Sequence, residues 1–164
     1  MLLLDRTGEI DDLWPRTGEG EPLPARGRAL VDPDRLEEAA ASPLELGVHL
    51  PNDADPRALA PLLPRIAMIS VDFPSFADGR GFSIGRCLRL IGFRGRLRAS
   101  GPVIADQFAY LLECGFDEVA VPDSVARRQP AERWMAELGA ITLGYQRGIA
   151  GRTSILERRR AGHG

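Results

Sequence analysis

The sequence contains no lysine, so all 21 of its basic residues are arginine. This absence excludes Schiff-base chemistry, pyridoxal-phosphate catalysis through the usual lysine, and a Walker-type phosphate-binding lysine. Arginine instead favours planar, bidentate contacts with carboxylate, phosphate or sulfur oxyanions. The chemistry to look for is therefore recognition of an anionic group.

Cysteine and histidine are almost as scarce, with two residues of each: Cys87, Cys114, His49 and His163. Two cysteines without a C-x-x-C motif cannot hold an iron–sulfur cluster or a cysteine-rich zinc site within one chain. Both fall at expected helix positions, which indicates buried packing, and a cytosolic disulfide is not expected. His49 lies inside an expected strand, where a single histidine indicates a structural role. Neither a cofactor nor a metal site can be identified.

Long apolar runs are also missing. The apolar start, Met1 to Leu4, is too short for a signal peptide or a membrane span, so we expect a cytoplasmic protein without a membrane partner. Apolar residues nevertheless make up 44% of the chain, which is enough for a packed core. A length of 164 residues fits one ordinary domain.

Acidic and basic residues are unevenly distributed, although the formal net charge is only −2. Residues 1–55 hold 13 acids and 5 arginines, whereas residues 56–164 hold 10 acids and 16 arginines. Residues 79–105 hold six arginines and no acid, which either attracts an anion or forms a solvated helix face. Basic residues do not interleave with aromatic ones, so nucleic acid is not an expected partner.

The chain divides into three expected parts. Residues 1–45 form an N-terminal extension that packs on the domain and is anchored by Trp14, residues 46–146 form an α/β domain, and residues 147–164 form a basic, mobile tail. In the domain, apolar runs of strand length alternate with helical stripes, as in parallel β/α units. This pattern predicts about five mostly parallel strands alternating with helices, in a flavodoxin-like open sheet or a partial β/α barrel. The expected strands are 46–50, 66–71, 96–99, 118–121 and 141–145; the expected helices are 55–63, 83–91, 100–115 and 130–138.

Ligands of parallel α/β folds bind at the carboxyl ends of the strands, and the richest of these ends is the segment from Asp72 to Ser83. Two of its glycines permit unusual backbone geometry, and the unpaired N–H groups of the following helix make a plausible anion cradle with the nearby arginines. The candidate catalytic acids or bases are Asp72 and Asp78. The candidate ligand-binding residues are Gly79, Arg80, Gly81, Ser83, Arg86, Arg98, Asp106 and Gln107. The structural alternative is that Asp78 or Ser83 caps the helix and that an Asp–Arg pair pins the loop.

The same loop carries a family resemblance. The run Phe73–Ser83, followed by Arg96–Ala99, Asp106-Gln107 and Cys114–Asp117, resembles a bacterial family of unknown function. The family is described as an oxidoreductase involved in sulfite reduction, and its genes lie beside assimilatory sulfite reductase. The resemblance covers most of the chain and is strongest over residues 46–121. The sequence departs from the family pattern at Pro102, where Asp is common, and at Ile84-Gly85, which replaces a more polar pair.

The resemblance implies a role in sulfite reduction, a multi-electron reaction that needs a cofactor this sequence does not supply. An accessory role therefore fits best, in which the protein binds an anionic ligand or the reductase through the loop. The expected partners are sulfite reductase or a small oxyanion. A second hypothesis is an enzyme, an oxidoreductase with Asp72 or Asp78 as acid or base and Arg80 as an electrostatic clamp. A third is a structural or interaction domain in which the loop is rigid architecture.

Overall fold

Residues 1–18 and 20–139 are described by the computed structural model of the chain, and their strands form one seven-stranded sheet. The strands are β1 (Leu2–Asp5), β2 (Gly8–Glu9), β3 (Arg28–Val31), β4 (Glu45–Leu50), β5 (Ile66–Asp72), β6 (Arg96–Ser100) and β7 (Glu118–Val121). The helices are α1 (Leu36–Ala40), α2 (Arg80–Leu90), α3 (Phe108–Glu113) and α4 (Asp123–Ala126), and residues 131–139 are also helical. Short 3-10 turns lie at Pro33–Arg35, Pro56–Leu59, Leu63–Arg65 and Ala105–Gln107.

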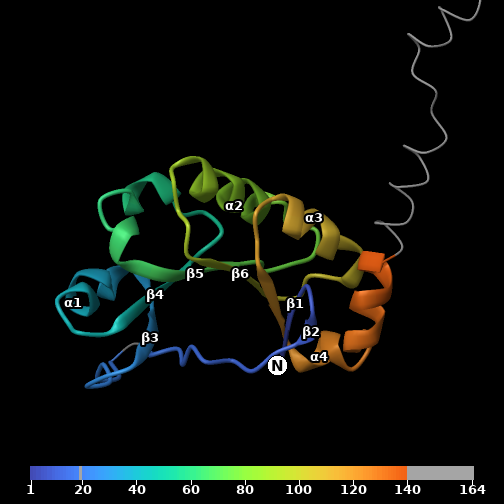
Figure 1. The fold of residues 1–164 in the computed structure, drawn as a ribbon, viewed down its shortest axis with the longest axis horizontal. Helices are drawn as coiled ribbons and strands as arrows, with labels where there is room; N and C mark the ends of the chain where they lie inside the picture. Colours follow the sequence, from blue (N-terminus) through green and yellow to red (C-terminus); the bar gives the residue numbers. More distant parts are fainter. Residues whose placement is uncertain (19, 140–164) are drawn as a thin grey trace, which may run out of the picture.

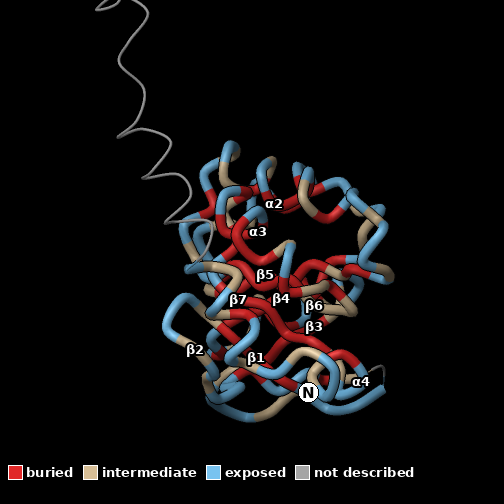
Figure 2. The backbone as a smooth tube through the Cα atoms, turned by 90° about the vertical axis from the view of Figure 1, so that its right-hand side faces the viewer, coloured by how far each residue is buried: buried red, intermediate tan, exposed pale blue. Residues whose placement is uncertain are grey.

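The sheet is open and has the strand order β2-β1-β7-β6-β5-β4-β3. Strands β3 to β7 are parallel and follow one another in chain order, whereas β1 and β2 are added antiparallel beside β7. Helices α2 and α3 lie together over one face, and the chain that leads from β2 to β3 runs along the opposite face (Figure 1). The buried strands therefore lie between a helical layer and a thinner layer of N-terminal chain (Figure 2).

The expected α/β class and the mostly parallel sheet are confirmed, but the expected number of about five strands is wrong. Leu2, Leu3 and Leu4, part of the apolar start that is too short for a membrane span, form a strand that pairs antiparallel with β7. Three of the seven strands come from residues 1–45, the segment expected to be an extension packing on the domain. The local pattern misses β1 because this strand is stabilised by a partner far along the chain. The expected strand at 141–145 and the tail at 147–164 lie outside the described residues.

The expected helix over residues 55–63 is replaced by two 3-10 turns. The helical turn does begin after Asp55 as expected, since the side chain of Asp55 accepts a hydrogen bond from the backbone N–H of Arg57 at 3.0 Å. Pro61 then prevents an α-helix from continuing, because it has no N–H to donate and its ring clashes with the preceding turn.

The two central helices begin at other residues than expected. Helix α2 begins at Arg80 rather than Ser83, because the backbone N–H of Arg80 donates to the side chain of Asp78 just before the helix. The helix expected from Ser100 begins as a 3-10 turn at Ala105. Ser100 is the last residue of β6, and Gly101 leaves the strand with φ +139°, a conformation that favours glycine.

The main core lies between the sheet and the helices. Its largest fully buried side chains are aromatic: Phe73, Phe93, Phe108, Phe116 and Trp134. Trp14 is buried as expected, in a second cluster with Leu30 and Met68 on the opposite face of the sheet. Among the described residues, no helix has the length and apolar character needed to cross a membrane.

Candidate functional site

The loop between β5 and α2 is built around the carboxylate of Asp78. Its Oδ1 accepts hydrogen bonds from the backbone N–H of Arg80 and from Arg80 Nε, both at 3.1 Å. Its Oδ2 accepts from Arg80 Nη2 and from Asn52 Nδ2, both at 2.7 Å. The hydrogen bond from the Arg80 side chain is the main reason that the pKa of Asp78 falls to about 2. Asp78 is therefore an ionised structural acceptor that braces Arg80 and the start of α2.

The glycines of this loop allow close packing rather than unusual backbone angles. Gly79 has φ −83°, and neither Gly79 nor Gly81 lies in the left-handed region. A Cβ added to Gly81 would lie 2.4 Å from the ring of Phe73, and one added to Gly85 would lie 2.4 Å from the ring of Phe116. These glycines let α2 press onto two buried rings, which fixes the helix and the loop before it.

The remaining candidates at this end of the sheet lie at its surface. Gln107 Nε2 donates to the carbonyl of Phe76 at 2.7 Å and so ties the loop to the start of α3. Arg86 is exposed on α2, with its guanidinium 5.5 Å from the ring centre of Tyr110. Ser83 and Asp106 are also exposed, whereas Asp72 is half-buried at the end of β5.

The structure thus brings Asp78, Arg80 and Gln107 into one loop assembly, together with Asn52, which follows the end of β4. Arg98, expected as a further ligand-binding residue of this loop, does not join the assembly. Side chains alternate between the faces of a strand, and its neighbours Leu97 and Ala99 belong to the core under α2 and α3. Arg98 therefore points to the opposite face.

On that opposite face a row of polar side chains crosses the sheet. His49, Ser70, Arg98, Glu118 and Asp5 are successive register partners on β4, β5, β6, β7 and β1. We call these five residues the polar row. Four of its members are buried, with exposed fractions of 9%, 1%, 4% and 1% in that order, and Asp5 is half-buried at the end.

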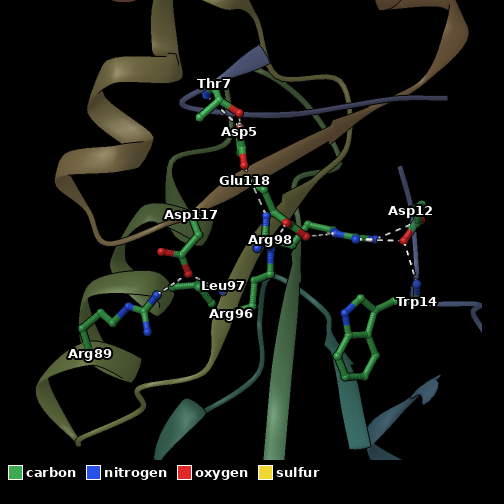
Figure 3. A network of polar contacts seen from close by, with 10 residues as sticks. All are labelled: Asp5, Thr7, Asp12, Trp14, Arg89, Arg96, Leu97, Arg98, Asp117 and Glu118. Carbon is green, nitrogen blue, oxygen red and sulfur yellow. Dashed lines mark hydrogen bonds and ion pairs between the residues drawn. The ribbon is translucent and has the colours of Figure 1, made fainter. Parts of the chain in front are cut away.

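The centre of the polar row is a network of ion pairs (Figure 3). Arg98 Nε donates to Glu118 at 2.6 Å, and its two terminal nitrogens donate to the carboxylate of Asp12 at 2.9 and 3.1 Å. Arg96 donates to the other oxygen of Glu118 and lies 3.5 Å from Asp5. Because an unpaired buried charge is costly, each buried charge here has a partner of opposite sign.

At the other end of the row, His49 Nδ1 lies 3.1 Å from Ser70 Oγ, at hydrogen-bond distance. The pKa of His49 is lowered from its ordinary value of 6.5, first by burial and then by the positive charge of Arg16. The nearby carboxylates of Asp72 and Asp32 oppose this shift in part. His49 is therefore neutral at neutral pH.

The N-terminal chain covers the polar row incompletely. It is fixed to β3 by reciprocal backbone hydrogen bonds of 3.0 Å, from Thr17 N to Leu30 O and from Leu30 N to Pro15 O. Two hollows of about 500 and about 480 Å³ remain between this chain and the sheet. The larger is lined by Arg96 and Glu118 among others. The smaller, which we call the row hollow, is lined by the polar-row members His49, Ser70 and Arg98.

Sequence reasoning named Arg98 and His49 but not Ser70, Glu118 or Asp12. A usable signal exists for two of the three. Ser70 and Glu118 are polar residues within strands whose other residues are mainly apolar, and such a residue marks a face that apolar packing does not cover. No local signal identifies Asp12, because it lies in chain without regular secondary structure.

Comparison with known proteins places the chain in a family. The family model described as bacterial protein of unknown function (DUF934) matches residues 47–156, about two thirds of the chain. The chain belongs to this family. The DUF934 match includes the loop before α2 and polar-row residues 49, 70, 98 and 118, but not the N-terminal chain that carries Asp12. No curated protein and no solved structure matches the sequence.

Proposed function

We propose that this DUF934 protein is a cytoplasmic accessory protein of assimilatory sulfite reduction that binds the reductase through the Phe73–Ser83 loop. The link to the pathway rests on the sequence resemblance of that loop. The observation that carries the binding role is the exposure of Phe76, which is 56% accessible on a braced loop that also leads to the largely exposed side chain of Arg80.

A binding role fits this loop better than a catalytic one. A general base is most effective when its pKa lies near the working pH, whereas that of Asp78 is about 2. Asp78 also accepts hydrogen bonds from Arg80 and Asn52, so its oxygens are already engaged. Arg98 cannot complete a site here, because it is bound to Glu118 and Asp12 on the other face.

The loop also has the properties of an efficient contact surface. Aromatic residues and arginine contribute most of the affinity in many protein interfaces. Phe76 is held by the Gln107 hydrogen bond to its carbonyl, and Arg80 is held by Asp78. Because both side chains are carried by an ordered loop, little entropy is lost on binding. The outward part of Arg80 suits an acidic group of the reductase.

We also infer that the architecture is closer to part of an opened β/α barrel than to a flavodoxin-like sheet. The support is the strand order, in which β3 to β7 succeed one another without reversal. A flavodoxin-like sheet reverses its order once and places its ligand at that point. In β/α barrels the functional residues lie in the loops after the carboxyl ends of the strands, and the Phe73–Ser83 loop directly follows the end of β5.

The proposal is tested with the purified chain and purified sulfite reductase in a direct binding assay. Phe76→Ala and Arg80→Ala should each weaken binding about tenfold or more, which corresponds to roughly 1.4 kcal/mol. Leu90→Ala is the matched control, since Leu90 is 86% exposed at the far end of α2 and should bind as the unmodified protein does.

A gene deletion provides the second arm. The deletion strain should grow poorly with sulfate as the sole sulfur source and normally with cysteine, and the Phe76→Ala gene should not restore growth. Normal growth of the deletion strain on sulfate would refute the role in the pathway. Unchanged binding by both loop variants, with their folds intact by circular dichroism, would refute the role of the loop.

A further inference from the structure

The row hollow has the size and the walls of a small-molecule site. Its volume of about 480 Å³ lies within the range of roughly 300–1,000 Å³ that ligand pockets occupy. One side is the sheet, with His49, Ser70 and Ser100, and the other is the N-terminal chain from Asp12 to Arg16. Apolar surface comes from Trp14, Leu30 and Ala120.

Two polar groups in this hollow are free to bind a ligand. His49 uses Nδ1 for its contact with Ser70, and Nε2 has no partner among residues 1–18 and 20–139. Every fully buried side-chain nitrogen or oxygen of these residues has a hydrogen-bond partner. Because Nε2 of His49 has none, it is not fully buried, and it faces the hollow that His49 lines. The hydroxyl of Ser100 also has no hydrogen-bond partner among the described residues. Ser100 is half-buried and lines the same hollow.

The charged groups around the hollow are, in contrast, already satisfied. Arg98 is paired with Glu118 and Asp12, Arg16 is paired with Asp32 at 2.8 Å, and the amino terminus is paired with Asp123. An anionic ligand would compete with these carboxylates for the arginines, and a cationic ligand would compete with the arginines for the carboxylates. An uncharged ligand faces neither competition.

We propose that the row hollow binds a small uncharged ring compound bearing an amide-like group, which hydrogen-bonds to His49 Nε2 and to the hydroxyl of Ser100. An amide offers both a donor and an acceptor, so it can satisfy either tautomer of a neutral histidine together with a hydroxyl. The ring occupies the apolar part of the hollow beside Trp14 and Leu30. This site is on the opposite face of the sheet from the loop proposed to bind the reductase, and it does not depend on that proposal.

The test uses three probes of nearly identical shape and different charge: benzamide, benzoate and benzamidine. Each is titrated into the full chain labelled with ¹³C-histidine. The protein has only two histidines, so a His163→Gln variant identifies the ring signal of His49. Benzamide should shift the His49 signal saturably, with a Kd on the order of 1 mM for so small a compound. Benzoate and benzamidine should bind at least tenfold more weakly.

Variants separate specific binding from surface effects. Ser100→Ala removes one of the two free groups, keeps His49 as the reporter, and should weaken benzamide binding at least fivefold. Ser124→Ala, a change of the same chemistry at an exposed position of α4 that does not line the hollow, should leave it unchanged. The proposal is overturned if benzamide gives no saturable shift up to about 20 mM in folded protein. Charged probes that bind as tightly as benzamide, or a Ser100→Ala variant that binds normally, would overturn it as well.

Discussion

Arg98 and Asp12 are separated by 86 positions in the sequence, yet the guanidinium of Arg98 donates two hydrogen bonds to the carboxylate of Asp12. The arginine is held in the middle of the sheet by Glu118, and the aspartate belongs to chain without regular structure. This paired contact fixes the N-terminal chain over the sheet and closes one side of the row hollow. It predicts that loss of the Asp12 carboxylate loosens the cover of the polar row, although backbone hydrogen bonds still join this chain to β3.

Replacement of that carboxylate should destabilise the protein. We expect Asp12→Asn to lower the free energy of unfolding by about 1.5–3 kcal/mol, the usual contribution of hydrogen bonds to a charged group. Asp11→Asn is the matched control, since Asp11 is a neighbouring exposed aspartate with no ion pair among the described residues, and its effect should stay within about 0.5 kcal/mol. Urea denaturation measures both, and hydrogen exchange should be faster over residues 10–17 in Asp12→Asn alone. Equal effects of the two variants would contradict the prediction.

The two glycines before and within α2 should respond differently to the same substitution. Gly81→Ala places a methyl group 2.4 Å from the buried ring of Phe73, so it should cost about 1–3 kcal/mol of stability. Gly79→Ala meets no atom within 4 Å, and its φ of −83° suits alanine. It should be neutral or should stabilise by about 0.4–1 kcal/mol. Thermal unfolding of the pair is the measurement, and a Gly81→Ala variant as stable as Gly79→Ala would show that Phe73 moves aside.

Asp78 should stabilise the fold in a pH-dependent way. Its pKa falls from 3.8 to about 2 because the Arg80 side chain hydrogen-bonds the ionised form. The folded protein therefore releases this proton more readily than the unfolded chain, so the stabilisation is complete above the unfolded value and is lost as the pH falls toward 2. Asp78→Asn should flatten that part of the stability profile between about pH 5 and 2. An unchanged acid profile in this variant would show that the Asp78–Arg80 pair is not maintained in solution.

His49 predicts a second pH effect in a different range. Its pKa is lowered from 6.5 mainly by burial, with Arg16 and Arg98 adding to the shift and Asp72 and Asp32 opposing it. The unfolded chain binds the proton more readily, so this contribution to stability is complete above pH 6.5 and declines as the pH falls below it.

Comparison of slopes isolates this contribution. Between about pH 7.5 and 5.5, the free energy of unfolding should fall more steeply in the unmodified protein than in His49→Gln. The slopes are compared rather than the absolute stabilities, because the substitution itself alters the contact with Ser70. The same slope in both proteins would mean that His49 titrates normally in the fold.

Much of the fold can be predicted from local patterns. The four central strands were placed to within one residue at each end, because apolar runs of strand length are bounded there by glycine, proline and charged residues. In the helix expected over residues 83–91, Ile84 and Leu88 are four positions apart, and both are buried in the main core, as apolar residues on one helical face should be. Strand β1 was missed as a sheet member, since three leucines do not reveal a partner in β7.

The candidate site was also predictable only in part, because sequence patterns reveal contacts between neighbouring residues but not contacts between distant ones. The loop with Asp78 and Arg80 could be identified because its residues are close in sequence and their hydrogen bonds span two positions. Arg98 was predicted to bind a ligand with that loop, whereas the alternation of side chains along β6 directs it to the other face. Which face of the sheet a strand residue occupies depends on the segments that pack on each face. Those segments come from the whole chain and cannot be read from the strand itself.

The sequence by itself determined the α/β class, the absence of lysine chemistry, the central strands and the glycine- and arginine-bearing loop before α2. These follow from composition and from patterns a few residues long. Only the tertiary structure decided that the N-terminal chain covers the second face of the sheet, that Asp12 meets Arg98, and that His49 and Ser100 share a hollow. Those contacts join residues that are distant in sequence, and their formation depends on the packing of the complete sheet.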